Sequence, residues 1–202
     1  MKKLFNRGLT FARELSQRLC RKINERLFSD EELIAIIDES LNAHLCLDAE
    51  LDHNVKIEYD IIEDFTAEEA ALIESQEKGS TNNRLLATTS LYDAGDYLVV
   101  FALEAMKDSA FNLWPWQVKK EIQGIAKHEA FHVRQYNYIY QHGGIEAFDR
   151  VVEYMMTTPY EDNIFEAGAY LYQWFDEVQD FEACFQDFIT PPEQSEADRS
   201  AA

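Results

Sequence analysis

Cysteine, proline and glycine are scarce in this 202-residue sequence, and it contains no long apolar run. The three cysteines, Cys20, Cys46 and Cys184, are odd in number and far apart, which argues against a disulfide framework or a CxxC zinc cluster and favours a reducing, cytoplasmic setting. The absence of a run of about 18 apolar residues excludes an ordinary membrane-spanning helix. Hydrophobic residues still make up 47% of the chain, so we expect a folded domain with a sizeable core.

Basic residues are also few, with 18 Lys and Arg against 38 Asp and Glu and a net charge of −20. Eight basic and two acidic side chains give residues 1–28 a net charge of +6, which leaves −26 for residues 29–202. Such an acidic body repels phosphate backbones, so we expect no general nucleic-acid binding. It tolerates cations well.

The basic segment, residues 1–28, has the pattern of an amphipathic helix. Its apolar residues recur mostly three and four apart, and arginines and lysines fill the other faces. Three roles fit: peripheral attachment to an anionic membrane, a targeting presequence, or docking on the acidic body of its own molecule or of a partner. We favour docking.

The remaining chain alternates helical and strand patterns. Helices are predicted, from spacing and capping residues, over residues 29–44, 67–77, 115–141, 145–156 and 162–189. Strands are predicted over residues 55–61, 85–92 and 97–103, the last two joined as a hairpin by residues 93–96. We therefore expect an α+β fold, a small and mostly antiparallel sheet covered by helices, in a domain of residues 29–189. Residues 190–202 are polar and predicted to be disordered.

The central helix, residues 115–141, carries an HExxH motif formed by His128, Glu129 and His132. Two histidines four residues apart lie one turn apart on the same helical face, so both can bind one metal ion. Glu129 has the position of a general base beside that ion. The alternative is a structural histidine pair that arose by chance in a glutamate-rich chain.

A catalytic zinc needs a third ligand and one position for water. The metzincin pattern would place Gly and His at positions 135 and 138, where this chain has Gln135 and Tyr138. A carboxylate from the following helix is the other common solution, with Glu166 the first candidate and Glu161 and Asp162 behind it. The alternative for Glu166 is a carboxylate that only stabilises the first turn of its helix.

Residues 128–135, HEAFHVRQ, and residues 162–169, DNIFEAGA, together resemble the minimal gluzincin domains, which are zinc metallopeptidase-like proteins. The family pattern is HExxHxxQ followed by a segment like DNPFExEA. The resemblance spans about residues 84–189 and implies a zincin-like fold, with one zinc ion per chain at His128, His132 and Glu166. Two positions depart from the pattern. Ile164 replaces the proline, and Gly168 replaces a second acidic residue, so a carboxylate that would orient a ligand is missing.

We therefore expect a zinc-dependent metallopeptidase that acts on a peptide or protein substrate, with Glu129 taking the proton from a zinc-activated water. Candidate donors to the developing oxyanion are close to the motifs in sequence: Tyr160, Tyr170, His142 and Arg134. An extended substrate is expected to add to the sheet along an edge strand at Tyr97–Ala102.

Two alternatives remain open from the sequence. A carboxylate-bridged di-metal protein is suggested by a second Glu-x-x-His pair, Glu50 and His53, although such a site needs four facing helices. A zincin-like domain without turnover, serving as a binding or structural module, is the stronger alternative. The intact Glu129 favours the enzyme.

Overall fold

The computed structural model describes residues 2–45, 56–68, 86–91 and 96–190, and within the first helix the side chains from residue 13 onward. Its helices are α1 (Lys2–Leu27), α2 (Asp30–Leu45), α4 (Leu103–Ala110), α5 (Pro115–Thr157), α6 (Ile164–Phe175), α7 (Phe181–Ile189) and the 3-10 turn η1 (Tyr160–Asp162). Its strands are β1 (Ile57–Ile62), β2 (Ala87–Leu91) and β3 (Tyr97–Ala102). The α+β class is confirmed.

The three strands form one sheet in the order β1-β3-β2. β2 runs antiparallel to β3, as the hairpin pattern predicted, but β1 runs parallel to β3. The expectation of a mostly antiparallel sheet is therefore wrong, because alternation along a strand fixes which side chains are buried and not the direction of its neighbour. β3 is also central. Its backbone is bonded to strands on both sides, so the prediction of an edge strand at Tyr97–Ala102 is wrong as well.

Several predicted features fall on residues that are not described. These are the loop at residues 93–95, most of the helix at residues 67–77, the Glu50 and His53 pair, and the tail beyond residue 190. Helix α4, in contrast, is described by the structure but was not predicted from the sequence; it directly follows β3. It brings the chain from the sheet to the start of α5.

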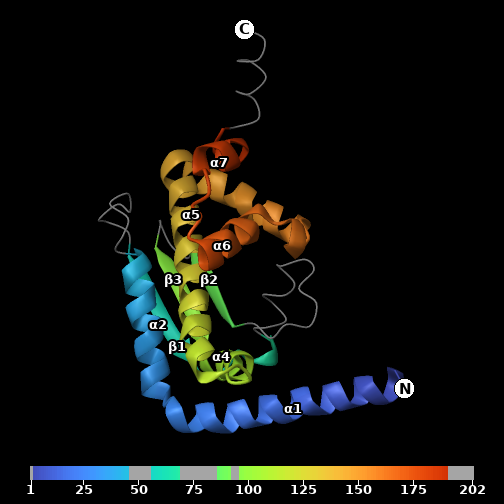
Figure 1. Ribbon diagram of the computed structural model, residues 1–202. Helices are drawn as coiled ribbons and strands as arrows, with labels where there is room; N and C mark the ends of the chain where they lie inside the picture. The colour runs from blue at the N-terminus through green and yellow to red at the C-terminus, as the bar shows by residue number, and fades with distance from the viewer. Residues whose placement is uncertain (1, 46–55, 69–85, 92–95, 191–202) are drawn as a thin grey trace.

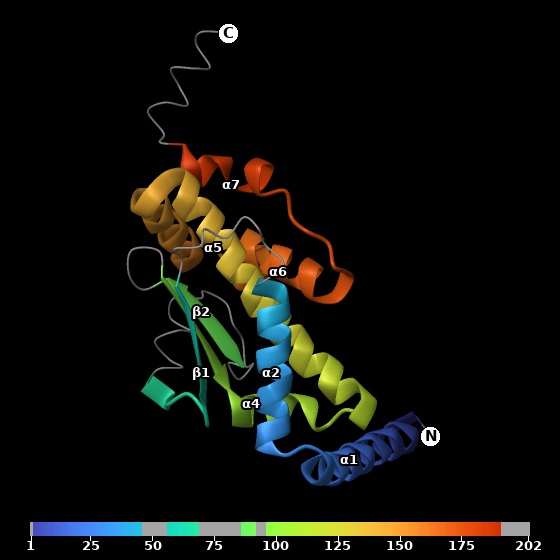
Figure 2. The ribbon, with the colours of Figure 1, turned by 90° about the vertical axis from the view of Figure 1, so that its left-hand side faces the viewer.

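Helix α5 runs through the middle of the molecule, between the sheet and α6, with α2 alongside it (Figures 1 and 2). Pro115 opens the helix, where its missing N–H costs no hydrogen bond. The helical spacing of six residues along this helix predicts that they form one inward-facing stripe, and the structure confirms it, since all six are buried: Val118, Ile122, Ile125, His132, Tyr136 and Ile139. Gly144 has a positive φ of 66° and kinks the helix where the Gly143-Gly144 pair predicted an end.

The sequence Ser29-Asp30-Glu31-Glu32 predicts a helix start with a serine cap and an acidic first turn. Helix α2 indeed begins with a capping box in which Ser29 and Glu32 exchange hydrogen bonds. The long helix predicted over residues 162–189 is instead divided into η1, α6 and α7. Asp176, in the left-handed conformation, ends α6. Phe175 and Val178 continue the apolar spacing of residues 162–189, which predicts that both are in the core. The break instead leaves them 68% and 58% exposed.

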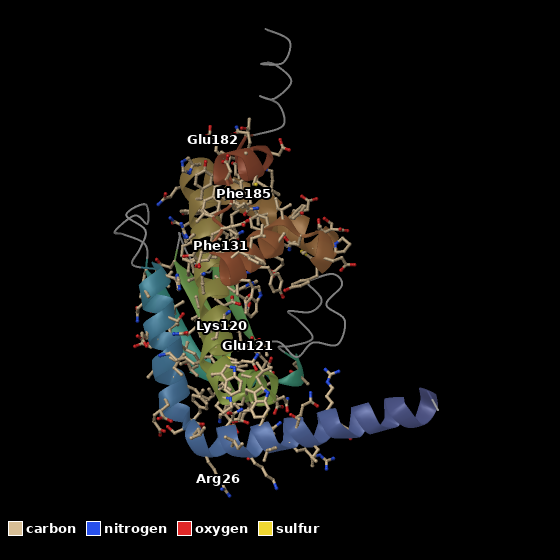
Figure 3. All side chains as sticks on the ribbon, viewed as in Figure 1. Arg26, Lys120, Glu121, Phe131, Glu182 and Phe185 are labelled. Carbon is tan, nitrogen blue, oxygen red and sulfur yellow. The ribbon has the colours of Figure 1, made fainter. Side chains whose placement is uncertain are left out.

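Beyond the break, α7 packs against α5 and α6. Phe185 stacks on Phe165 at 4.9 Å between ring centroids, and Phe181 contacts Phe131 at 5.6 Å. Figure 3 shows Phe131 and Phe185 in the region where α5 meets α6 and α7. This aromatic cluster fixes α6 against the motif-bearing turn of α5.

Helix α1 lies across one end of the molecule, next to α4 and the start of α5 (Figures 1 and 2). Arg21 forms an ion pair with Asp108 at 2.6 Å, and the Asn24 amide donates to the carbonyl oxygens of Phe111 and Leu113. In the described parts of the chain, no helix has both the length and the apolar character needed to cross a bilayer.

Candidate metal centre

His128 and His132 project from the middle of α5 into the same buried space. Their Nε2 atoms lie 3.0 Å apart, and both side chains are almost fully shielded from solvent. The convergence follows from the four-residue spacing on a continuous helix. The sequence prediction that these two side chains share a face is confirmed.

The third member comes from α6. Oε2 of Glu166 lies 3.3 Å from Nε2 of His128, and Oε1 lies 3.4 Å from Nε2 of His132. The capping role is filled by Asn163, whose Oδ1 accepts a hydrogen bond from the backbone N–H of Phe165 at 2.9 Å. Glu166 is therefore free of that task, and its side chain is only 12% exposed.

The two fallback ligands are not brought to the histidines. Glu161 and Asp162 lie in η1 and are exposed, and neither belongs to the cluster of potential ligand atoms. Their carboxylates remain in solvent because η1 precedes the turn that directs the chain into the core. Among the three sequence candidates, Glu166 is the one in coordinating position.

The cluster fits a single small cation. One atom from each of His128, His132 and Glu166 lies within 4.8 Å of the other two. Two ligands bound to zinc at about 2.0–2.1 Å with tetrahedral geometry stand about 3.3–3.4 Å apart. The observed separations of 3.0, 3.3 and 3.4 Å are close to that value. Two imidazole nitrogens and one carboxylate are also a common catalytic zinc donor set.

The ring of His132 is oriented by Gln135, one turn further along α5. Nδ1 of His132 lies 2.9 Å from Oε1 of Gln135. The amide nitrogen of Gln135 donates at 3.0 Å to the carbonyl oxygen of Phe165 and to Oε1 of Gln179, so Oε1 of Gln135 must be the acceptor. Nδ1 of His132 therefore carries a proton, and the Nε2 lone pair is available to a metal.

The glycine at position 168 makes room for this amide network. A Cβ atom there would stand 2.8 Å from Nε2 of Gln135 and closer still to the amide of Gln179. The resemblance to gluzincins implied a missing carboxylate at this position. The amides of Gln135 and Gln179 occupy the space beside Gly168, where Gln179 bonds to Gln135 and Gln135 bonds to His132.

His128 has a similar partner on α6. Its Nδ1 atom lies 3.2 Å from Oε1 of Gln173. A Cβ atom on Gly124, one turn before His128, would stand 3.0 Å from the amide nitrogen of Gln173. The glycine therefore provides the space through which Gln173 reaches the histidine.

These partners explain why the centre favours a positive charge. With both Nδ1 atoms donating, two neutral imidazoles would direct their Nε2 lone pairs at each other at 3.0 Å beside a carboxylate, an arrangement that favours a proton or a metal ion between these groups. Burial opposes a charge on His132, but the carboxylate of Glu166 outweighs it and raises the pKa of His132 to about 9. Burial likewise opposes ionisation of Glu166, yet His132 and His128 hold its pKa well below the usual range. A cation in this space satisfies all three groups.

Glu129 lies beside the centre but outside the set of ligand atoms. Its carboxylate accepts a hydrogen bond of 2.8 Å from Oγ1 of Thr89 on β2, and it contributes to the raised pKa of His132. Glu129 is buried, so the helix and the sheet together hold a second carboxylate near the histidines. A general base needs this kind of position, near the metal without binding it.

Two tyrosines adjoin the ligands. The ring of Tyr170 packs edge-on against the ring of His128 at 4.9 Å, and its hydroxyl lies 3.0 Å from the hydroxyl of Tyr160. Burial, together with the nearby carboxylate of Glu166, raises the pKa of Tyr160 well above its usual range. Tyr160 therefore remains a neutral hydroxyl that can donate a hydrogen bond.

The other two candidate donors lie elsewhere. His142 is exposed, and its Nδ1 atom is bonded to the carbonyl oxygen of Tyr138 at 2.8 Å. The guanidinium of Arg134 stands over the rings of Phe131 and Tyr172, at 5.4 and 5.2 Å. Neither side chain is brought to the ligand cluster.

Sequence reasoning did not identify Thr89, Gln173 or Gln179 as parts of the site. They come from β2, α6 and the segment before α7, and nothing in the local pattern links them to the motif. Gln135 is part of the HExxHxxQ pattern that the sequence shows, but no role was assigned to it there; its position three residues after His132 on the same helical face is a signal for one. The sequence matches no protein-family model, and the comparisons with curated proteins and with solved structures found no match.

Proposed function

We propose that the protein is a zinc-dependent peptidase with a zincin-like fold, in which His128, His132 and Glu166 hold one zinc ion and Glu129 acts as the general base. The observation that carries the proposal is the convergence of three ligand atoms from α5 and α6, with a fourth buried group, the Glu129 carboxylate, held beside them. The resemblance of residues 128–135 and 162–169 to minimal gluzincin domains supports the same assignment.

A zinc ion in this site supplies a Lewis acid that polarises a carbonyl group and lowers the pKa of water to about 7. Glu129 accepts the proton from the attacking water and passes it to the leaving amine. Thr89 keeps the carboxylate in one orientation through its hydrogen bond. The shielding of Glu129 and of the ligands from solvent strengthens each of these electrostatic interactions.

Tyr160 and Tyr170 are the best placed donors for the oxygen that gains charge during the reaction. Their hydroxyls share one hydrogen bond, and the ring of Tyr170 contacts the ring of His128. One hydroxyl of the pair donates to the other, so the accepting tyrosine keeps its own O–H to donate to a substrate oxygen. This is the preorganised kind of donor that stabilises an oxyanion.

β2 replaces β3 as the proposed docking strand for an extended peptide. It stands at the end of the described three-stranded sheet, packs against α5 and carries Thr89. A peptide added alongside this strand would pass the Glu129 carboxylate. The substrate class is therefore an unstructured polypeptide segment, which can adopt the extended conformation that strand addition requires.

Elemental analysis of the purified protein is the first test of the proposal. We expect about one zinc per chain, lost in His132→Ala and in Glu166→Ala and retained in Glu161→Gln. Glu161 is a matched acidic control five residues before Glu166, and it is exposed. Two iron or manganese ions per chain would instead support the di-metal alternative, and no bound metal would refute the centre.

Turnover is tested separately with a denatured protein substrate. We expect cleavage that a chelator abolishes and that zinc restores, and no cleavage by Glu129→Gln despite unchanged zinc content. Zinc binding without cleavage of any peptide library member would favour the alternative of a zincin-like binding module. Cleavage that Glu129→Gln retains would refute the assigned base.

A further inference from the structure

We propose that α1 binds an anionic membrane surface through the apolar face that it turns away from the rest of the protein. The inference does not depend on the metal centre, which lies on α5 and α6. It depends on a mismatch between two faces of α1: the face that packs on the body is not the face that carries the leucines.

The docked face of α1 is defined by Cys20, Asn24 and Phe28, which follow one another at four-residue intervals. Cys20 is 1% exposed and Asn24 is fully buried. The Asn24 amide donates to two backbone carbonyl groups just before α5, and the ring of Phe28 lies 6.3 Å from the ring of Phe111. This face is partly polar, and the body accepts the hydrogen bonds that the Asn24 amide donates.

Leu15 and Leu19 lie on another face, where they are 59% and 54% exposed. Leu27 is also 54% exposed, but it stands about 120° around the helix from Leu15, on the side of Cys20. Successive residues of a helix are about 100° apart, so Asn24 stands about 180° around the helix from Leu15. Leu19 stands only about 40° from Leu15. The apolar face therefore points away from the contact with the body. Towards the N-terminus the sequence continues the same helical spacing with Leu4, Phe11 and Ala12.

Basic residues lie on and beside this leucine face. Arg18, Lys22 and Arg26 are exposed and follow one another at four-residue intervals, about 60° or less from the line of Leu15 and Leu19. Figure 3 shows Arg26 pointing away from the body. Among the residues that the structure describes, these three form no ion pair, whereas Arg21, on the body side, pairs with Asp108 and Glu25.

Exposed leucines together with basic side chains indicate what binds to this face of α1. A helix that lies in a bilayer interface buries its leucines among the acyl chains and places basic side chains at the headgroups. The net charge of +6 on residues 1–28 attracts anionic lipid, while the remaining −26 would be repelled by it. Helix α1 lies across one end of the molecule, with the acidic body on the other side of the helix (Figures 1 and 2). The leucine face can therefore contact an anionic surface while the body stays away from it.

The experiment is flotation of the full-length protein with vesicles of phosphatidylglycerol and phosphatidylcholine, compared with vesicles of phosphatidylcholine alone. We expect binding to the anionic vesicles only, reduced at least tenfold when the salt concentration rises from 0.05 to about 0.5 M, because screening shortens the reach of the charges. The double variant Leu15→Glu/Leu19→Glu should lose at least tenfold in binding.

The matched control is Ile145→Glu/Val178→Glu, which adds the same two charges at similarly exposed apolar positions on the body. It should bind vesicles like the unchanged protein. Both variants should keep the zinc content and the thermal unfolding midpoint of the parent, since the four side chains lie at the surface. Loss of zinc from either variant would indicate a change at the metal centre, and the vesicle-binding result could still be interpreted separately.

Three outcomes would overturn the proposal. One is no binding to anionic vesicles, and a second is binding that the leucine substitutions leave unchanged. The third is a dimer in sedimentation experiments that Leu15→Glu/Leu19→Glu dissociates, which would assign the leucine face to the acidic body of a second copy.

Discussion

The side chain of Gln173 occupies the space that a Cβ atom at position 124 would need, and through that space its Oε1 atom reaches Nδ1 of His128 at 3.2 Å. Glycine inside a helix costs about 1 kcal/mol relative to alanine. The missing side chain at this position lets Gln173 contact His128, one of the proposed zinc ligands. The two residues therefore act as one unit, although they lie on different helices.

Substitution of Gly124 by alanine should separate folding stability from metal affinity. The alanine restores helix propensity, so we expect the free energy of unfolding of the metal-free protein to stay equal or to rise by up to about 1 kcal/mol. It also displaces the amide of Gln173, so we expect zinc affinity to fall about tenfold. Competition with a chromophoric chelator measures the affinity.

The variant Gln173→Leu completes a double-mutant cycle. It removes the acceptor for His128 directly and should weaken zinc binding about as much as Gly124→Ala. The double variant should be no weaker than Gln173→Leu alone, because both changes remove the same contact. Additive losses would contradict the linkage between Gly124 and Gln173.

A second glycine substitution probes the other histidine. A Cβ atom in Gly168→Ala would stand 2.8 Å from Nε2 of Gln135 and would push this amide away from His132. We expect zinc affinity to fall about 10- to 100-fold, since the partner that fixes the ligand is displaced. We also expect a loss of about 1–3 kcal/mol of stability without metal, because buried amide groups lose partners.

Ala167→Ser is the matched control for this position, since residue 167 lies on the same turn of α6 and is exposed. It should change neither quantity appreciably. Unfolding in urea with a chelator present measures the stability, and chelator competition measures the affinity. Unchanged zinc affinity in Gly168→Ala would show that Gln135 does not control the orientation of His132.

The sequence predicted the parts of the centre that are local. The four-residue spacing of His128 and His132 determines their convergence on any continuous helix, and the buried stripe of α5 followed from its period. Glu166 was one of three carboxylate candidates. The choice among them depended on how η1 and α6 approach α5, and no local pattern contains that information.

The errors in the fold have related causes. The direction of β1 relative to β3 is set by the path of the chain through space, so alternation in either strand could not predict it. The break at Asp176 was missed because the apolar spacing continues through Phe175 and Val178, although these two side chains are exposed. Periodicity predicts the burial of a face only when a neighbouring element covers that face.

Thr89 offers a test of the base that leaves the ligands intact. Thr89→Val keeps the shape of the side chain and removes the hydroxyl that donates to the Glu129 carboxylate. A hydrogen bond to a charged group contributes about 1.5–3 kcal/mol, so we expect cleavage of a peptide substrate to slow about 10- to 100-fold. Zinc content should stay at the parent value.

Thr88→Val is the matched control on the same strand, where the neighbouring side chain points to the other face of the sheet. It should leave the cleavage rate within about twofold of the parent. Comparable cleavage by Thr89→Val and Thr88→Val would argue against a role for Thr89 in holding the base.

His44, at the end of α2, should make stability depend on pH without involving the metal centre. Its Nδ1 atom bonds to the hydroxyl of Tyr172 at 3.0 Å. Burial, and then the positive charges of Lys127 and Arg134, lower the pKa of His44 below 6.5, against the opposing charge of Asp176. The folded protein therefore favours the neutral imidazole, whereas the unfolded chain protonates this residue near pH 6.5.

The sign of the effect follows from proton uptake. Below pH 6.5 the unfolded state binds more protons at this position than the folded state, so the contribution of His44 is complete above pH 6.5 and is lost as the pH falls towards the lowered pKa. In His44→Gln this loss is absent, so the parent should lose more stability than the variant between pH 7.5 and about 5. Urea unfolding with a chelator present measures both proteins, and the titration of the metal ligands cancels in the comparison. A parent that becomes more stable relative to His44→Gln as the pH falls would show that the folded state favours the protonated imidazole instead.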